Sequence, residues 1–275
     1  MINRRQALEK LSGGLLLALG LWPGALRASD AARDGRLKFI VVNDTHLMSD
    51  ACAEWLRGVI QRMKEAKPDF CLHLGDLTEY GKREHHAVTR DVFQELGCPV
   101  HAVPGNHDYN SPKSLRYYNL FFPRRRNYVF EFNGWQFVGL DTTEGQKYEK
   151  TRIQPDTLEW ADKQAPRLDQ RRPTIIFTHF PLGAGVKYRP LNADELLEKF
   201  KLLNLQVVFS GHWHGYTERR HGDLRLYTNK CCALKRSNHD RTPEKGFWVA
   251  ENKDGQIHLD FIEVPCPKPE PARKS

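Results

Sequence analysis

The chain has 275 residues, of which 40% are hydrophobic, and it carries a formal net charge of +8. A chain of this length folds as one large or two small domains, and its hydrophobic fraction excludes disorder as the overall state. The positive charge suits an anionic substrate, but the basic doublets are scattered and form no continuous stripe of the kind that binds duplex nucleic acid.

The first residues have the features of an export signal. Arg4 and Arg5 precede an uncharged stretch, 11–26, that is rich in Leu, Ala and Gly. This stretch contains Pro23 and is shorter than the roughly 20 residues that span a bilayer as a helix. We therefore expect residues 1–28 to be a bacterial-type export signal, and the paired arginines are similar to a twin-arginine signal. The mature protein would be periplasmic or extracellular; a retained N-terminal anchor is the alternative.

After this leader, short apolar runs alternate with amphipathic stretches. Runs rich in β-branched and aromatic residues predict strands, and apolar residues three and four apart predict helices. Asn133-Gly134, between two such runs, is a strong hairpin signal. Strands are expected at 37–43, 70–74, 99–103, 128–132, 135–140, 174–178, 205–210, 224–228, 246–250 and 257–264, and helices at 53–66, 85–95, 157–168 and 193–203.

This order of elements predicts a layered α/β fold in which hairpins extend the sheets. We find no internal repeat and no clean linker, so the interpretation is a single domain. Residues 29–36 are assigned to an N-terminal linker and residues 37–264 to the domain. Residues 265–275, which are Pro-rich and charged, are assigned to a flexible C-terminal tail.

Five of the predicted strands end in short loops that carry residues typical of metal ligands. The loops are Asn43-Asp44-Thr45-His46, Gly75-Asp76, Gly105-Asn106-His107-Asp108, Thr178-His179 and Gly211-His212-Trp213-His214. Residues two apart on an extended backbone point the same way, so Asp44 and His46 can hold one ion. Ligand sites in open α/β sheets form at the carboxyl ends of strands, so we expect these side chains to converge. Carboxylate and imidazole ligands suit Mn, Fe, Zn or Ni.

The five loops, in this order, resemble the signature of the calcineurin-type metallophosphoesterase superfamily: Asp-x-His, Gly-Asp, Gly-Asn-His-Asp/Glu, His and Gly-His-x-His. Further similarities, to the branch that contains cyclic-nucleotide phosphodiesterase-like enzymes, are Gly75-Asp76-Leu77-Thr78 with Gly81, Leu140-Asp141-Thr142 and Leu158-Glu159-Trp160. The resemblance covers about residues 37 to 264. It implies a four-layer α/β/β/α sandwich with two mixed sheets.

The resemblance also implies roles for these residues. One metal ion would bind Asp44, His46 and His214, the other would bind Asn106, His179 and His212, and Asp76 would bridge the two. The ions would be two divalent or trivalent transition metals, and a hydroxide between them would attack a phosphomonoester or phosphodiester. His107 would meet the phosphoryl group as an acid or as a charge-stabilising residue, and Asp108 would orient its ring. The alternative for Asp108 is a turn residue that caps the loop.

Two other functions stay open. A nuclease of the same superfamily would act on DNA or RNA, although the scattered charge predicts no strong nucleic-acid binding. A non-catalytic binding protein on the same fold would be expected to show broken motifs, whereas all five are intact here. The expected partner is therefore a small-molecule phosphoester, with membrane contact only through the export signal. The remaining histidines, His73, His101 and His239 among them, are interpreted as structural.

Overall fold

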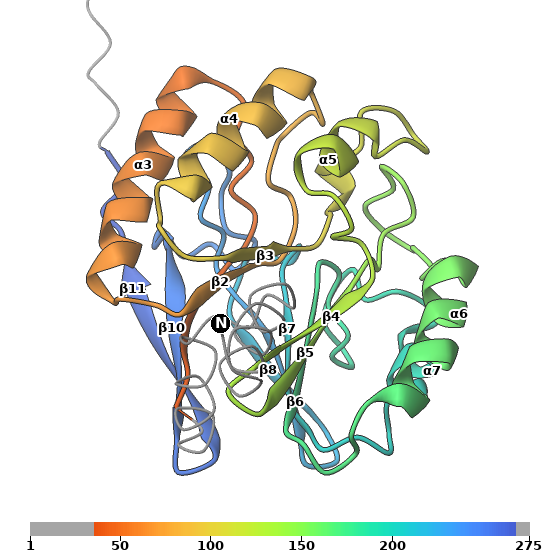
Figure 1. Cartoon of the computed structure of the whole chain (residues 1–275). Helices are drawn as coiled ribbons and strands as arrows, with labels where there is room; N and C mark the ends of the chain where they lie inside the picture. The colour runs from red at the N-terminus through yellow and green to blue at the C-terminus, as the bar shows by residue number, and fades with distance from the viewer. Residues whose placement is uncertain (1–35, 268–275) are drawn as a thin grey trace, which may run out of the picture.

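A computed structural model describes residues 36–267, in which two β-sheets pack face to face between two outer layers of helices (Figure 1). The predicted export signal, residues 29–35 of the predicted linker and the last residues of the predicted tail lie outside the described residues. Across 36–267, none of the helices combines the length and the apolar character that a bilayer span requires. The four-layer α/β/β/α sandwich expected from the sequence is confirmed.

The first sheet is mixed and has the strand order β11-β10-β1-β2-β3. Its strands are β1 (Lys38–Val42), β2 (Phe70–His73), β3 (Val100–Ala102), β10 (Gly246–Lys253) and β11 (Gln256–Glu263). The strands β1, β2 and β3 are parallel, so their carboxyl ends lie at one edge of the sheet. The β10–β11 hairpin extends the sheet on the other side of β1, in antiparallel pairing.

The second sheet is also mixed, with the order β4-β5-β6-β7-β9-β8. Its strands are β4 (Tyr128–Phe132), β5 (Trp135–Leu140), β6 (Thr174–Thr178), β7 (Leu205–Ser210), β8 (Thr217–His221) and β9 (Leu224–Thr228). The four inner strands are parallel and the two outer strands are antiparallel to their neighbours. The predicted hairpin at Asn133-Gly134 is confirmed, because both residues have the positive φ that a tight turn of this kind requires.

Helices cover the outer face of each sheet (Figure 1). On the first sheet lie α3 (Asp50–Glu65) and α4 (Arg83–Gln94), and on the second lie α6 (Pro155–Gln164) and α7 (Ala193–Lys199). The remaining helical elements are α5 (Arg116–Phe121) and the 3₁₀ turns η1 (Asn106–Asp108) and η2 (Ala165–Arg167). Neither α5 nor β8 was among the elements predicted from the sequence.

The alternation of side chains along β1 explains why there are separate apolar layers. Phe39 and Val41 are buried between the two sheets, whereas Ile40 and Val42 are buried under the helices of the first sheet. A strand directs successive side chains to opposite faces, so an unbroken apolar run lets β1 contribute to both layers. Sheet-on-sheet packing then fixes the carboxyl ends of β1, β2 and β3 beside those of β6 and β7.

Candidate metal centre

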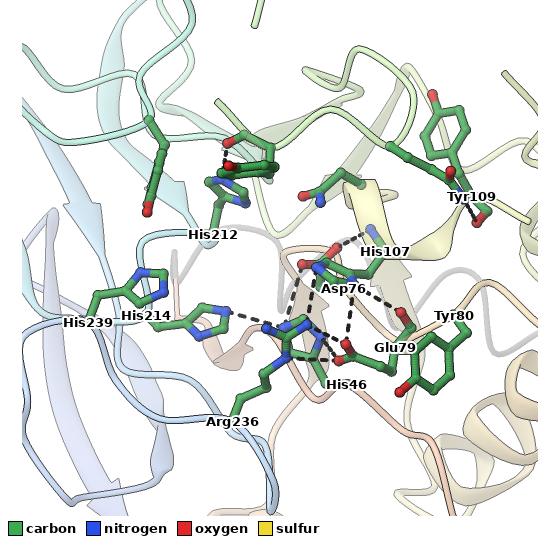
Figure 2. Close-up of a pocket in the computed structure, with 14 residues that line it drawn as sticks. His46, Asp76, Glu79, Tyr80, His107, Tyr109, His212, His214, Arg236 and His239 are labelled. Atoms are coloured by element: carbon green, nitrogen blue, oxygen red, sulfur yellow. Dashed lines mark hydrogen bonds and ion pairs between the residues drawn. The ribbon is translucent and has the colours of Figure 1, made fainter. Parts of the chain in front are cut away.

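The predicted ligands converge where the carboxyl ends of the two sheets meet. Figure 2 shows those that line the pocket, His46, Asp76, His212 and His214 among them. In one group, Nε2 of His46 lies 3.2 Å from Nε2 of His214, and Oδ1 of Asp44 lies 3.1 Å from the same His214 nitrogen. In the other, Nε2 of His179 lies 3.2 Å from Oδ1 of Asn106 and 3.1 Å from Nδ1 of His212. All of these side chains are buried.

Asp76 lies between the two groups. Its Oδ2 atom is 3.5 Å from Nε2 of His46 and 3.4 Å from Nε2 of His179. Its other oxygen, Oδ1, accepts a hydrogen bond from the backbone N–H of His107 at 2.9 Å, which fixes the orientation of the carboxylate. One oxygen of a single carboxylate therefore faces both groups at nearly equal distances.

The backbone of these loops differs from the extended conformation predicted from the sequence. Asp44 and His46 have φ of +53° and +44°, and His212 and His214 have φ of +62° and +44°. In each pair, the left-handed backbone conformation of both residues directs their side chains toward the centre. The alternation of side chains along an extended strand does not. A bulky residue at positive φ costs on the order of 1–3 kcal/mol, and such strain is concentrated at functional sites.

Each of the four imidazoles is anchored through the nitrogen that points away from the centre. His179 Nδ1 donates to the carbonyl of Leu74 at 2.9 Å, and His212 Nε2 donates to the carbonyl of Tyr148 at 2.8 Å. Nδ1 of His214 lies 3.3 Å from the carbonyl oxygen of Ser237. Nδ1 of His46 lies 2.9 Å from a carboxylate oxygen of Glu79. Since a carbonyl or carboxylate can only accept, a neutral ring held in this way carries its proton on the outer nitrogen and has its lone pair on the inner nitrogen, as a metal ligand requires.

This arrangement fits metal ions. Two imidazole lone pairs 3.1–3.2 Å apart repel each other unless a cation lies between them. Ligands about 2.0–2.2 Å from one ion are separated by roughly 3.0–3.5 Å. This is the spacing of His214 from its two partners in the first group and of His179 from its two partners in the second, whereas His46 and Asp44 are 3.8 Å apart. Nitrogen and carboxylate donors of this kind suit Mn, Fe, Zn or Ni better than Mg or Ca.

The electrostatics of the centre also favour positive charge. Burial opposes the ionisation of Asp44 and Asp76, but the neighbouring histidines, His214 for Asp44 and His179 for Asp76, hold the pKa of both carboxyls well below its usual range. Conversely, burial acts to lower the pKa of His179, but the Asp76 carboxylate beside it raises that pKa to about 9. Two ionised carboxylates are thus buried together and require cationic partners.

Asp108 does not make the contact expected of it. Its carboxylate accepts backbone hydrogen bonds from Gly105, Leu77 and Thr78 at 2.9–3.2 Å, and so joins the loop after β3 to the loop after β2. The Nδ1 atom of His107 instead lies 2.9 Å from the carbonyl of Glu79. The predicted orienting role of Asp108 is therefore corrected, and its contacts match the alternative of a residue that caps the loop.

Two charged residues at the centre, Glu79 and Arg236, were not predicted from the sequence. Glu79 contacts His46, and its two carboxylate oxygens also accept from two of the three nitrogens of the Arg236 guanidinium, Nε at 2.9 Å and one terminal nitrogen. Burial acts to raise the pKa of Glu79, but the hydrogen bonds from His46 and Arg236 outweigh it and lower the pKa to about 2. The terminal nitrogen of Arg236 also lies 3.4 Å from Nε2 of His107. The only feature of the sequence that pointed to either residue was the position of Glu79, three residues after the predicted ligand Asp76.

A pocket of about 460 Å³ opens above the centre and makes it accessible from solvent. His46, Asp76, His107 and Arg236 line one part of it, as Figure 2 shows. His239, interpreted from the sequence as structural, also lines the pocket, and its ring stacks on that of His214 with centroids 4.9 Å apart. His73 and His101 are packed in the core, where they contact Phe93 and Phe130.

The fold and this buried carboxylate–imidazole centre define a metal-dependent hydrolase. Residues 37–216 match the model of the family described as calcineurin-like phosphoesterase. The chain belongs to that family and is a metal-dependent phosphoesterase. The family resemblance expected from the five loops is thereby confirmed.

Two relatives and one solved structure are similar to this chain. A probable cyclic nucleotide phosphodiesterase of Synechococcus is 29% identical over 193 residues, which are 65% of this chain and 73% of the relative. A probable glycerophosphodiester phosphodiesterase of Arcobacter nitrofigilis is 23% identical over 241 residues, covering 80% and 87% of the two chains. Among solved structures, a dimetal phosphatase from Danio rerio superposes with a TM-score of 0.64 at 15% identity, over 82% of this chain and 95% of that one. This last likeness concerns the fold alone.

Gly105 provides a test of how closely the loops must approach. A Cβ atom at this position would lie 2.1 Å from Oδ1 of Asp76 and 2.3 Å from its backbone nitrogen. We expect Gly105→Ala to displace Asp76 and to abolish tight metal binding, measured as metal content after gel filtration. Gly58→Ala is the matched control, because nothing lies within 4 Å of its Cβ and alanine stabilises a helix by about 1 kcal/mol relative to glycine. Normal metal content in Gly105→Ala would show that the close approach is dispensable.

Proposed function

We propose that this protein is a dinuclear phosphodiesterase that hydrolyses small phosphodiesters. The observation that carries the proposal is the convergence of seven side chains into two ligand groups that share Asp76. In this proposal one ion is held by Asp44, His46 and His214, the other by Asn106, His179 and His212, and Asp76 bridges both. When bound, the two ions supply Lewis acidity and an activated water for in-line attack on phosphorus.

The side chains around the pocket favour a diester over a monoester. Arg236 is the only lysine or arginine among the described residues that line the pocket, and Glu79 neutralises it. A phosphodiester carries a single negative charge, whereas a monoester carries up to two near neutral pH, so low positive charge beyond the metal ligands suits the diester. The same scarcity of basic residues disfavours a nuclease that would bind long nucleic acids. The names of the two relatives, both phosphodiesterases, support the same choice.

His107 is the residue proposed to act on the leaving group. Its backbone N–H is bonded to Asp76 and its Nδ1 to the Glu79 carbonyl, so the Nε2 atom faces the pocket. From this position Nε2 can hold the proton that the departing alkoxide needs, or stabilise its negative charge. His107 makes none of the contacts that define the two ligand groups.

Arg236 is proposed to bind an oxygen of the phosphoryl group. Its Nε and one terminal nitrogen are engaged by Glu79, and that nitrogen also faces Nε2 of His107. The other terminal nitrogen has no hydrogen-bond partner among residues 36–267 and remains available to a ligand in the pocket. Because the guanidinium is a rigid fork fixed by Glu79, this donor is preorganised beside the leaving-group residue.

The role of His107 is tested by separating turnover from metal content. Bis-p-nitrophenyl phosphate should be hydrolysed by the wild-type protein with Mn or Zn added. We expect His107→Ala to lower kcat about 10²- to 10⁴-fold because proton transfer or charge stabilisation is lost, while metal content stays at the wild-type value. Equal loss of turnover and of metal would identify His107 as a ligand and contradict the assignment.

The role of Arg236 is tested with two substitutions. A hydrogen bond to a charged group contributes about 1.5–3 kcal/mol, so Arg236→Ala should lower kcat/KM for the same diester roughly 10- to 150-fold. Arg236→Lys retains the charge but not the fork, and should lie between the alanine variant and wild type. Metal content is measured in parallel, because Arg236 also contacts Glu79. Wild-type kcat/KM in Arg236→Ala would exclude contact with the substrate.

We also propose that the protein is exported, on the sequence of residues 1–28 alone. In a Gram-negative host the full chain should be recovered from the periplasm. Replacement of both Arg4 and Arg5 by lysine should retain it in the cytoplasm, because the twin-arginine route depends on that pair. Periplasmic recovery of the double lysine variant would indicate the general secretory route, and recovery of the wild-type chain from the membrane fraction would indicate a retained anchor.

A further inference from the structure

Two exposed tyrosines lie at the rim of the pocket. The described residues contain six large apolar or aromatic side chains that are more than half exposed, and two of these, Tyr80 and Tyr148, line the pocket. Exposed aromatic rings beside a concave site are typical of surfaces that a ligand covers. The ring of Tyr148 is 57% exposed. Tyr188 is its one aromatic neighbour within 36–267, at 6.3 Å between centroids and an interplanar angle of 67°.

The backbone fixes Tyr148 relative to the metal centre. Its carbonyl accepts the 2.8 Å hydrogen bond from Nε2 of His212, whose Nδ1 faces the second ligand group. The backbone carbonyl of Tyr148 is therefore one imidazole away from the centre, and Tyr148 lines the same pocket as His212. A substituent on a phosphorus bound at the centre would share this pocket with Tyr148. Tyr80 lies on the other side of the centre, as its separation from His212 across Asp76 in Figure 2 shows.

Tyr188 supports Tyr148 from beneath and is itself held in a strained conformation. Its φ is +68°, which is rare for a bulky side chain and is maintained only where the surrounding structure imposes it. Its ring packs against His212 at 5.1 Å, and against His239 and Trp213 at 5.7 and 6.0 Å between centroids. The strain therefore places an aromatic ring between a predicted metal ligand and the exposed ring of Tyr148.

We propose that Tyr148, supported by Tyr188, stacks on a planar aromatic group carried by the ester substituent that stays on phosphorus. This inference rests on the proposed phosphodiesterase function and narrows its substrate class to diesters with a nucleobase or an aryl group. A polyol substituent such as glycerol has no planar face and gains nothing from the ring. Stacking on an aromatic side chain is tolerant of the identity of the base, so the surface selects for aromatic character rather than for one base.

The experiment compares substrates that share p-nitrophenol as the leaving group and differ in the group retained on phosphorus. Thymidine 5′-(p-nitrophenyl phosphate) retains a nucleoside, phenyl p-nitrophenyl phosphate retains an aryl group, and methyl p-nitrophenyl phosphate retains neither. Release of nitrophenolate gives kcat/KM for each. Tyr148→Ala should lower kcat/KM for the thymidine substrate about 5- to 100-fold and change that for the methyl substrate less than two-fold.

Control variants separate stacking from other effects. Tyr148→Phe keeps the ring. It should therefore retain the wild-type ratio of kcat/KM for the thymidine substrate to kcat/KM for the methyl substrate. Tyr216→Ala removes a comparably exposed tyrosine outside this pocket and should leave all three substrates unchanged. If Tyr148→Ala lowers kcat/KM for both the phenyl and the thymidine substrates, the ring recognises any planar group. If it lowers kcat/KM for the thymidine substrate alone, the ring recognises a nucleoside.

Other results overturn the inference. An unchanged thymidine-to-methyl ratio in Tyr148→Ala excludes the stacking role, and an equal loss with all three substrates shows that the ring contacts the leaving group instead. Both results leave the phosphodiesterase function intact, because the wild-type protein still cleaves the methyl substrate. If the metal-loaded wild-type protein cleaves none of the three, the proposed function fails and the inference fails with it.

Discussion

The contact at the outer nitrogen of each imidazole is the interaction on which this centre depends. It is a hydrogen bond to a backbone carbonyl in His179, His212 and His214, and a 2.9 Å contact with the Glu79 carboxylate in His46. The four acceptors come from the loop after β2, the loop before α6, the segment between β9 and β10, and the side chain of Glu79. Each acceptor fixes one ring and its tautomer, and it raises the basicity of the nitrogen that faces the centre. The fold therefore sets which nitrogen of each neutral ring faces the centre as well as the position of the ring.

The loops that present these ligands are strained, and the parallel strands hold them in place. Five of the seven predicted ligands have positive φ: Asp44, His46, Asp76, His212 and His214. Backbone hydrogen bonds across the first sheet continue into these loops, from Asp44 to Gly75 and from His46 to Asp76. A loop tied in this way has few alternative conformations, so the cost of the strain is borne by sheet pairing rather than by binding.

The sequence predicted most of the fold and the positions of the seven candidate ligands, because both depend on local patterns. It did not predict β8, whose residues Thr217–His221 include four charged or ionisable side chains in succession and form an edge strand with little burial. Glu79 and Arg236 were missed for a different reason. They are 157 positions apart, and Arg236 lies in an irregular segment with no periodicity, so only the folded chain brings them together. The role of Asp108 was misjudged because sequence adjacency to His107 does not determine where a side chain points.

The two ligand groups are not divided between the two sheets; each contains residues from both. Asp44 and His46 follow β1 of the first sheet, while His214 follows β7 of the second; Asn106 follows β3, while His179 and His212 follow β6 and β7. Neither group is complete until the sheets pack against each other, and that packing is made by interlocking aromatic rings, Phe39 with Phe137 and Phe209 among them. Metal ions that bind only the complete groups must therefore stabilise the contact between the sheets by mass action. Packing of the aromatic layer between the sheets and metal binding at the pocket are in this way thermodynamically linked. A substitution between the sheets therefore weakens metal binding even though it changes no ligand.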